Sequence, residues 1–172
     1  MKIKREHIGD CGLTSTFQKD VDWLNELISD LKTKDFSFSK PMSLTLTATK
    51  SEGNIFIRGK IKTTVILCCA RCLESFEYPV DTDMNLTFVP ASERPQQVED
   101  TSPDLEFYEG DTIDLSRGMR DQILLAIPLK PLCKNSCRGL CPQCGVNLNV
   151  GSCNCHKVAF DSKFKILKEL AK

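Results

Sequence analysis

Hydrophobic and polar residues alternate through the middle of the chain. Apolar residues alternate with threonines over Leu44–Thr49, and after the turn Ser51–Asn54 a second alternating stretch runs from Ile55 to Leu67. Its apolar side holds Ile55, Ile57, Ile61, Val65 and Leu67, and its polar side holds Arg58, Lys60 and Lys62. A third stretch alternates through Phe76, Tyr78, Val80, Met84, Leu86 and Phe88. A period of two with one apolar side is typical of antiparallel strands that bury one face, so we predict an antiparallel β meander with one wet face.

Helical spacing appears on both sides of this meander. Before it, apolar residues fall at Val21, Leu24, Leu27, Ile28 and Leu31, with Asp20 as the expected N-cap and Pro41 at the end of the following connector. After it, Asp111–Leu115 reads as a short extended segment. Ser116 is then the expected cap of a helix that runs to Ala126, buries Met119, Ile123, Ala126 and Ile127, and stops at Pro128. A last amphipathic helix is expected from about Asp161. The fold class predicted is α+β, a β meander with flanking helices and a C-terminal zinc-knuckle segment.

The length of 172 residues suits one domain with a small appendage. We expect residues 1–132 to form an α+β core and residues 133–172 to form a cysteine-rich zinc knuckle with a C-terminal helix packed on the core. Residues 90–111 are acidic, rich in proline and aperiodic, so they are expected to be a mobile loop.

Cysteine content points to metal chemistry. The chain holds 10 cysteines, and most of them form closely spaced pairs. The pairs are Cys69 with Cys72, Cys133 with Cys137, Cys141 with Cys144, and Cys153 with Cys155. Such spacing turns two sulfurs toward one volume, and four thiolates complete a tetrahedral zinc shell. We therefore predict two structural Zn²⁺ sites, with Cys11 and Cys68 left over.

Spacing alone leaves the division of the cysteines open. Cys141, Cys144, Cys153 and Cys155 lie close together in the chain and suggest one self-contained site. Cys69 and Cys72 would then share an ion with Cys133 and Cys137, which would join the hairpin to the segment after Pro128. The alternative groups the four cysteines from Cys133 to Cys144 and leaves Cys69 and Cys72 as a reactive dithiol. His156 is a further candidate ligand beside Cys155.

The formal net charge is zero, which argues against non-specific binding of nucleic acid, but the charges are unevenly distributed. Residues 81–114 hold ten acids and one Arg, whereas residues 117–172 hold ten Lys or Arg and three acids. Four cations lie in or beside the cysteine pairs and are candidate RNA-binding residues: Arg71, Lys130, Lys134 and Arg138. Two alternatives stay open. In the first, Arg71 packs on Phe76 or binds carbonyls of its own turn and does not contact RNA. The second concerns the stripe of Arg58, Lys60 and Lys62. This stripe either binds phosphates or pairs across strands with Glu77, Asp81 and Asp83.

Two segments carry a resemblance to a known family. They are Cys69-Ala-Arg-Cys72-Leu-Glu-Ser-Phe76 and the run from Asp121-Gln-Ile-Leu-Leu-Ala-Ile-Pro128 through Cys133 to Cys155. In this order they resemble the YceD-type proteins needed for accumulation of 23S ribosomal RNA. The resemblance covers roughly residues 44–155. It implies a non-enzymatic, RNA-linked role in assembly of the large ribosomal subunit. Its expected partners are 23S rRNA or an assembly intermediate, or else a ribosomal protein or processing nuclease.

The residues themselves offer no reaction centre. With two histidines, a hydrolytic triad is not expected, and neither a P-loop nor a dinucleotide-binding glycine motif is present. Shells made only of cysteine are closed, unlike catalytic zinc sites. The remaining alternatives are thiol–disulfide chemistry at Cys69 and Cys72, and a protein-only adaptor. The charged N-terminus and the lack of a long apolar run favour a cytoplasmic protein without a membrane partner. Because no reaction centre is evident, we expect no small-molecule substrate.

Overall fold

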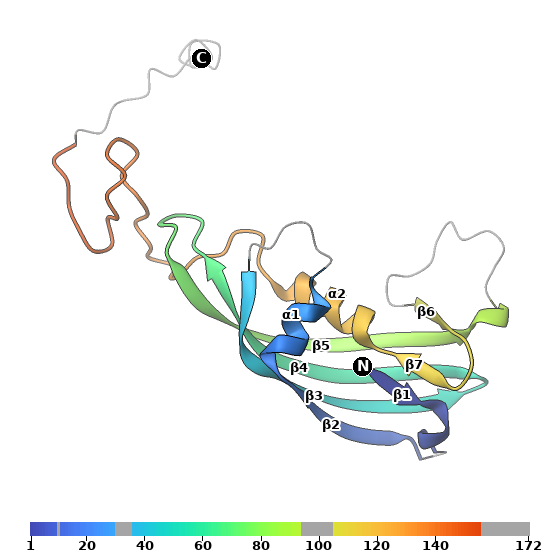
Figure 1. The fold of residues 1–172 in the computed structure, drawn as a ribbon. Coiled ribbons are helices and arrows are strands. Elements are labelled where there is room, and N and C mark those ends of the chain that lie inside the picture. The colour runs from blue at the N-terminus through green and yellow to red at the C-terminus, as the bar shows by residue number, and fades with distance from the viewer. Residues whose placement is uncertain (10, 30–35, 94–104, 156–172) are drawn as a thin grey trace, which may run out of the picture.

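A computed structural model of the chain describes residues 1–9, 11–29, 36–93 and 105–155. Its largest element is a five-stranded sheet with the order β2-β3-β4-β5-β6 (Figure 1). The strands are β2 (Leu13–Lys19), β3 (Phe36–Ser51), β4 (Asn54–Cys68), β5 (Ser75–Pro90) and β6 (Leu105–Tyr108). Neighbours from β2 to β5 pair antiparallel, and β6 pairs parallel to β5. The predicted α+β fold with an antiparallel meander is confirmed.

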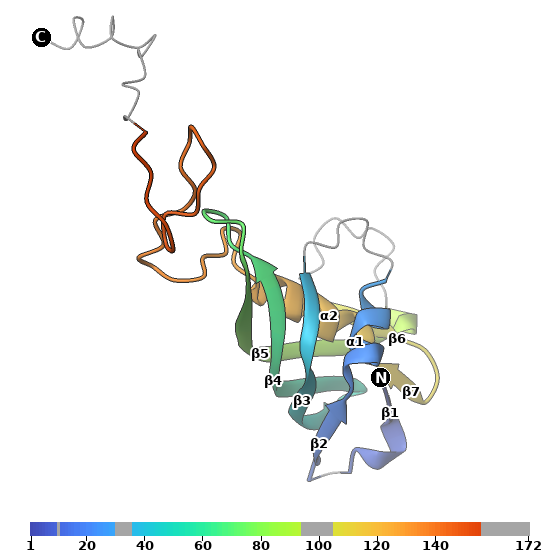
Figure 2. The same ribbon diagram turned by 60° about the vertical axis from the view of Figure 1, so that its left-hand side comes forward.

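One face of the sheet is covered and carries the core. The helices α1 (Val21–Leu27) and α2 (Ser116–Ala126) pack there, together with a ribbon of β1 (Lys2–Lys4) and β7 (Thr112–Asp114) (Figure 2). The fully buried side chains come from the apolar positions of the alternating strands and from these covering elements; they include Leu24, Leu44, Leu46, Ile57, Ile61, Met84, Phe88, Ile113 and Met119. Burial of this apolar area is the main stabilisation of the fold. A short 3₁₀ turn, η1 (Arg5–His7), follows β1.

The helix ends differ in how closely they follow the prediction. Asp20 caps α1 as expected, since its side chain accepts from the Trp23 amide at 2.9 Å. Ser116, however, is the first residue of α2 and not its cap, and its own amide donates to Asp114 Oδ1 at 2.9 Å. The predicted helix from about Asp161 lies outside the described residues, as does Leu31.

The expectation that residues 90–111 form a loop is wrong for part of that range. A 3₁₀ turn, η2 (Ala91–Glu93), follows β5, and β6 pairs with residues 87–90 of β5. The hydroxyl of Tyr108 in β6 donates to the Gly53 carbonyl at 2.7 Å and anchors the strand against the β3–β4 turn. These are tertiary contacts, so local alternation gave no sign of them. Residues 94–104 are outside the described part of the chain.

The position of Pro41 also differs from the prediction. It lies inside β3 and does not end a connector, and the register of β3 against β4 shifts between Lys40 and Ser43. A bulge accommodates a proline because the irregular register removes the need for its missing N–H. The strand therefore begins at Phe36, earlier than the alternation from Leu44 predicts.

The wet face of the sheet is nearly balanced in charge. Lys60 Nζ lies 3.2 Å from Asp81, Lys62 Nζ lies 3.4 Å from Asp81, and Lys60 lies 3.9 Å from Asp83. Glu77 pairs with Lys40 at 2.7 Å and not with the basic stripe. Such exposed pairs each contribute only a few tenths of a kcal/mol. Two cations of the stripe are thus engaged by carboxylates, which favours the pairing alternative over phosphate binding on this face.

Candidate metal centres

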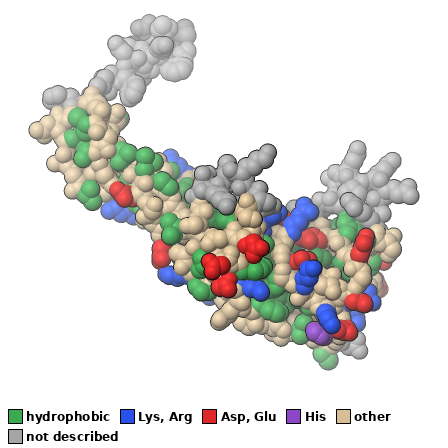
Figure 3. All heavy atoms as spheres, viewed as in Figure 1, with side chains coloured by type: hydrophobic (Ala, Val, Ile, Leu, Met, Phe, Trp, Pro, Cys, Tyr) green, Lys and Arg blue, Asp and Glu red, His purple; other side chains and the backbone are tan. Residues whose placement is uncertain are grey.

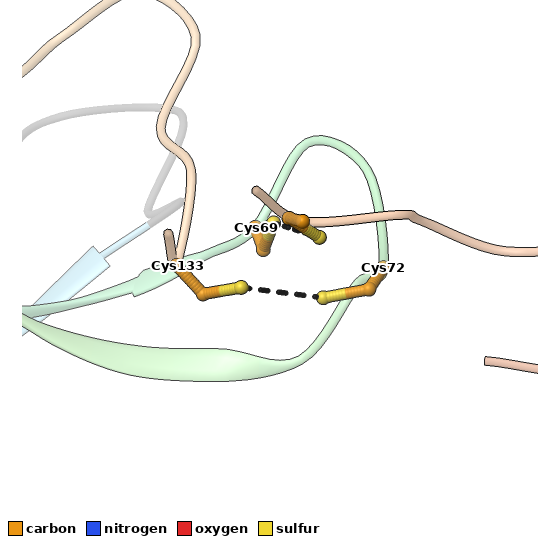
Figure 4. A group of neighbouring side chains, drawn as sticks. Cys69, Cys72 and Cys133 are labelled. Carbon is orange, nitrogen blue, oxygen red and sulfur yellow. Dashed lines mark hydrogen bonds between the residues drawn. The ribbon is translucent and has the colours of Figure 1, made fainter. Parts of the chain in front are cut away.

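The tip of the β4–β5 hairpin and the segment after α2 bring four cysteines together. The sulfurs of Cys69, Cys72, Cys133 and Cys137 all lie within 4.8 Å of one another. Cys69 Sγ is 3.8 Å from Cys137 Sγ, and Cys72 Sγ is 3.7 Å from Cys133 Sγ. Figure 4 shows the sulfurs of Cys69, Cys72 and Cys133 directed toward one another from the hairpin and from the later segment. We refer to these four residues as the first cysteine group.

The spacing of these sulfurs fits a metal and not a disulfide. Zn–S bonds of about 2.3 Å at tetrahedral angles place neighbouring sulfurs about 3.8 Å apart. A disulfide requires about 2.0 Å. The distances between the sulfurs therefore match those of a closed Zn(Cys)₄ shell, in which the four thiolates supply every ligand.

The pKa values in the first group show why a cation suits it. Burial raises the pKa of the Cys69 thiol, but backbone hydrogen bonds, including one from Cys133, outweigh burial and bring that pKa to about 6. Burial and the neighbouring sulfurs raise the pKa of Cys133 to about 12. One thiolate thus forms readily and opposes ionisation of another, because like charges close together disfavour each other. A cation would remove this opposition, so the arrangement favours binding of a metal ion with release of protons.

A second cysteine group follows in the chain. The sulfurs of Cys141, Cys144, Cys153 and Cys155 also lie within 4.8 Å of one another. Cys141 is buried, whereas Cys144 and Cys155 are exposed. Backbone hydrogen bonds from Cys144 and Gln143 lower the pKa of Cys141 to about 6, and the Cys144 sulfur, with burial, raises the pKa of Cys155 to about 12. The two groups share the same donor set, and the second is more open to solvent.

The same backbone knuckle occurs in both groups. The amide of Leu73 donates to the Cys69 carbonyl at 2.9 Å, and the amide of Gly145 donates to the Cys141 carbonyl at 2.9 Å. The first cysteine of each knuckle donates to the residue five positions later, Cys69 to Glu74 and Cys141 to Val146, both at 2.9 Å. The turn requires a left-handed residue after its second cysteine, which is Leu73 at φ 61° in one case and Gly145 at φ 74° in the other.

The two groups are joined by a close backbone approach. The Leu140 amide donates to the Arg71 carbonyl at 3.1 Å. At Gly139 the φ is 75° and a Cβ would lie 3.0 Å from that same carbonyl, so glycine suits both the backbone conformation and the close approach. The Ala70 amide donates to the Pro131 carbonyl at 2.8 Å and holds the later segment against the hairpin.

The four predicted RNA-binding residues are all exposed near the cysteine groups, but their surroundings differ. Arg71 Nη1 donates to the carbonyls of Cys137 at 2.9 Å and Asn135 at 3.3 Å. Its guanidinium therefore binds carbonyls, as one alternative expected, although they belong to the partner cysteine pair and not to its own turn. Among the described residues, no carboxylate lies within ion-pair distance of Lys130, Lys134 or Arg138.

Cys68 and Cys11 belong to neither cysteine group. Cys68 is the last residue of β4, and its thiol donates to the Leu73 carbonyl at 3.3 Å. Cys11 is exposed, and His156 lies outside the described residues. Sequence reasoning missed two residues that support the sites, Gly139 and Asn149. A glycine two positions after Cys137 is a weak signal for the first, and for the second there is none, because an asparagine in a loop is common.

Comparisons with known proteins agree with the pattern of motifs. The sequence model of a family described as "Large ribosomal RNA subunit accumulation protein YceD" matches residues 57–171. A relative from Arabidopsis thaliana, "Large ribosomal RNA subunit accumulation protein YCED homolog 1, chloroplastic", is 26% identical over 162 residues, which cover 80% of this chain and 50% of the relative. The protein of the same name from Zea mays is 29% identical over 142 residues, 67% of this chain and 48% of the relative.

A bacterial relative is more distant. "Large ribosomal RNA subunit accumulation protein YceD" from Haemophilus influenzae is 27% identical over 78 residues, 45% of each chain. The chain spans about half the length of these curated relatives. No solved structure matches the chain. In the described part of the molecule, no helix has the length and apolar character needed to cross a membrane.

Proposed function

Because the chain belongs to the YceD family of large ribosomal RNA subunit accumulation proteins, we propose that it is a non-enzymatic, zinc-binding factor for accumulation of 23S rRNA. It acts in the cytoplasm on the rRNA or on an assembly intermediate of the large subunit. The observation that carries the proposal is the combination of the family match with two four-cysteine groups beside exposed cations, three of which have no acidic partner within the described part of the chain.

The proposed zinc is structural. All eight sulfurs belong to all-cysteine groups, which leave no ligand position for a substrate. In the first group, zinc would hold the β4–β5 hairpin against the segment that follows α2. In the second, it would hold the loop between Cys141 and Cys155. By holding these segments in place, the two cysteine groups would fix the backbone that carries the neighbouring cations.

The proposed RNA contact lies at this end of the molecule. Lys130, Lys134 and Arg138 are exposed without an acidic partner among the described residues, whereas Lys60 and Lys62 on the sheet are paired with Asp81. Cations that are free of carboxylates attract phosphate more strongly. Arg71 is expected to contribute mainly through its hydrogen bonds to the carbonyls of Asn135 and Cys137, with its charge adding to the local field.

Two alternatives remain distinct from this proposal. Thiol–disulfide exchange between Cys69 and Cys72 is disfavoured by the geometry, because the short sulfur contacts run from each to a cysteine of the later segment. A protein adaptor that binds a ribosomal protein or a processing nuclease would use the same exposed end without touching RNA. Crosslinking of the protein in cells, followed by sequencing of the attached RNA, separates the RNA-contacting factor from the adaptor.

A binding experiment tests the proposed surface. Affinity for a 23S rRNA fragment is measured across salt concentrations, where the log–log slope is about −0.7 per phosphate contacted on single strands. The double variant Lys134→Gln, Arg138→Gln should bind more weakly and with a flatter slope, while zinc content stays the same. The matched control, Lys60→Gln with Lys62→Gln, removes the same charge from the sheet and should leave the slope unchanged. An unchanged slope in the first variant would contradict the proposed surface.

A further inference from the structure

We propose that Leu73, at the tip of the β4–β5 hairpin, contacts an unpaired RNA base, so that the first cysteine group selects single-stranded over duplex RNA. This inference rests on the proposed function and adds to it the class of RNA that is bound. It starts from an apolar side chain in a backbone conformation that stability alone would give to glycine.

The position of Leu73 is unfavourable in two respects. Its φ of 61° lies in the left-handed region, where a residue with a Cβ is disfavoured, and the equivalent residue of the second knuckle is Gly145. Its side chain is also 64% exposed, so burial returns little. Backbone strain of this kind clusters at active sites and ligand-contact sites, which makes Leu73 a candidate contact residue.

The surroundings of Leu73 favour a nucleic acid as the occupant. The cations Arg71, Lys134 and Arg138 belong to the same two cysteine-containing segments, and Lys134 and Arg138 have no acidic partner among the described residues. On the face that Figure 3 draws, side chains of the class coloured green, which includes cysteine and proline, are exposed toward the cysteine-rich end. Single strands are generally bound by side chains that contact the base faces, most often aromatic ones, while cations follow the phosphates. Leu73 offers an apolar surface to a base in the corresponding place, with cations on the same segments.

The residue beside Leu73 distinguishes a base from a phosphate. Glu74 is exposed, and its carboxylate accepts from Asn147 Nδ2 at 3.4 Å. A carboxylate at this point repels phosphate but tolerates a neutral base. Bases are available for such a contact only where they are unpaired, because a duplex keeps their faces stacked inside.

The test compares two RNA probes on the full chain loaded with zinc. One is an unstructured RNA of about 12 nucleotides, within the usual range of single-strand site sizes, and the other is a duplex of the same length. Leu73→Asn keeps a residue that tolerates the left-handed region while removing the apolar contact, and Leu73→Gly removes both the contact and the strain. Both variants should bind the single strand at least about fivefold more weakly and the duplex with unchanged affinity.

Controls separate this contact from loss of structure. Both variants should keep the wild-type zinc content, and Leu73→Gly should unfold at an equal or higher temperature. Leu125 on α2 is 78% exposed, so Leu125→Asn is a matched removal of an exposed leucine and should not change RNA binding. Wild-type affinity of both Leu73 variants for the single strand overturns the inference. If the wild-type protein binds neither probe nor the rRNA fragment, the proposed RNA contact fails as well. If the wild-type protein binds RNA with the expected salt dependence but the Leu73 variants bind as well as the wild type, only the proposed role of Leu73 is rejected.

Discussion

Asn149 donates from its side-chain amide to the sulfur of Cys137 at 3.3 Å. The donor belongs to the loop of the second cysteine group and the acceptor to the first. Burial raises the pKa of Cys137, but this hydrogen bond, a backbone one from Gly139 and the Cys72 and Cys133 side chains together lower it. The two groups are therefore linked not only by chain connectivity but also by a bond that stabilises a thiolate.

This bond predicts that Asn149→Ala lowers the zinc affinity of the first group. Loss of a hydrogen bond to a metal ligand typically costs ten- to a hundredfold in affinity, and we expect a loss of at least about tenfold here because the substitution also removes the hydrogen bond that the Asn149 oxygen accepts from the Arg138 amide. Competition against a chromogenic chelator measures the effect. Asn154→Ala changes an exposed asparagine beside the second group and is the matched control. Equal zinc affinity in Asn149→Ala and the wild type would show that this hydrogen bond does not stabilise the first group.

Removal of one cysteine ligand from each group should unfold regions of different size. Cys141→Ser should increase hydrogen exchange mainly within residues 139–155, because that group is confined to one loop. Cys72→Ser should also expose the end of the β4–β5 hairpin and the segment after α2, which the first group joins. Hydrogen exchange followed by mass spectrometry maps both. An identical pattern for the two variants would show that the groups unfold as one unit.

Arg71 is predicted to matter for structure before it matters for charge. Arg71→Gln removes the hydrogen bonds to the carbonyls of Cys137 and Asn135, which hold the two cysteine pairs together. Because the side chain is exposed, we expect a loss of about 1 kcal/mol in the free energy of unfolding. Denaturant unfolding of the zinc-loaded protein measures this loss. Lys130→Gln removes a neighbouring exposed charge, and it should have no effect on stability.

The central sheet was predictable because its strands are long and bury one side. In β4, every buried position from Ile55 to Leu67 falls on the same parity, so the pattern is visible without any partner. β6 has only four residues and depends on the Tyr108 contact with Gly53, so its sequence resembles a loop. β2 was not predicted, although its threonines alternate with Leu13 and Phe17 and gave a usable signal.

The cysteine groups were predictable in kind but not in membership. Closely spaced pairs indicate tetrahedral sites, but which pairs share a site depends on where α2 carries Cys133 relative to the hairpin. The structure brings Cys133 and Cys137 to Cys69 and Cys72, not to Cys141 and Cys144. Asn149 and the role of Arg71 depend on the same placement, so no local pattern could reveal them.

Glu106 in β6 provides a prediction on pH. Partial burial raises its pKa above 4.5, and Arg117 opposes the rise only in part. The folded protein therefore binds this proton more tightly than the unfolded chain, and stability should decrease as pH rises from 4.5 through the raised pKa. Glu106→Gln should be more stable than the wild type at neutral pH and lack this decrease. Thermal unfolding at pH values from about 4 to about 8, which start near the ordinary pKa of Glu, measures both effects. Glu109→Gln, at an exposed position, is the control. A wild-type pH profile in Glu106→Gln would contradict the assignment.

The join at the first cysteine group also sets an expected order of folding. The β4–β5 hairpin is local in sequence, whereas Cys72 and Cys133 are 61 residues apart. Closing a loop of that length costs about 4 kcal/mol of chain entropy in the loop-closure model. Docking of α2 on the sheet brings the ends of this loop together before the metal binds, so we expect the hairpin tip and Lys134 to reach their final positions last. A partly folded chain would then lack the surface proposed to meet rRNA, and completion of the core would act as a checkpoint on binding.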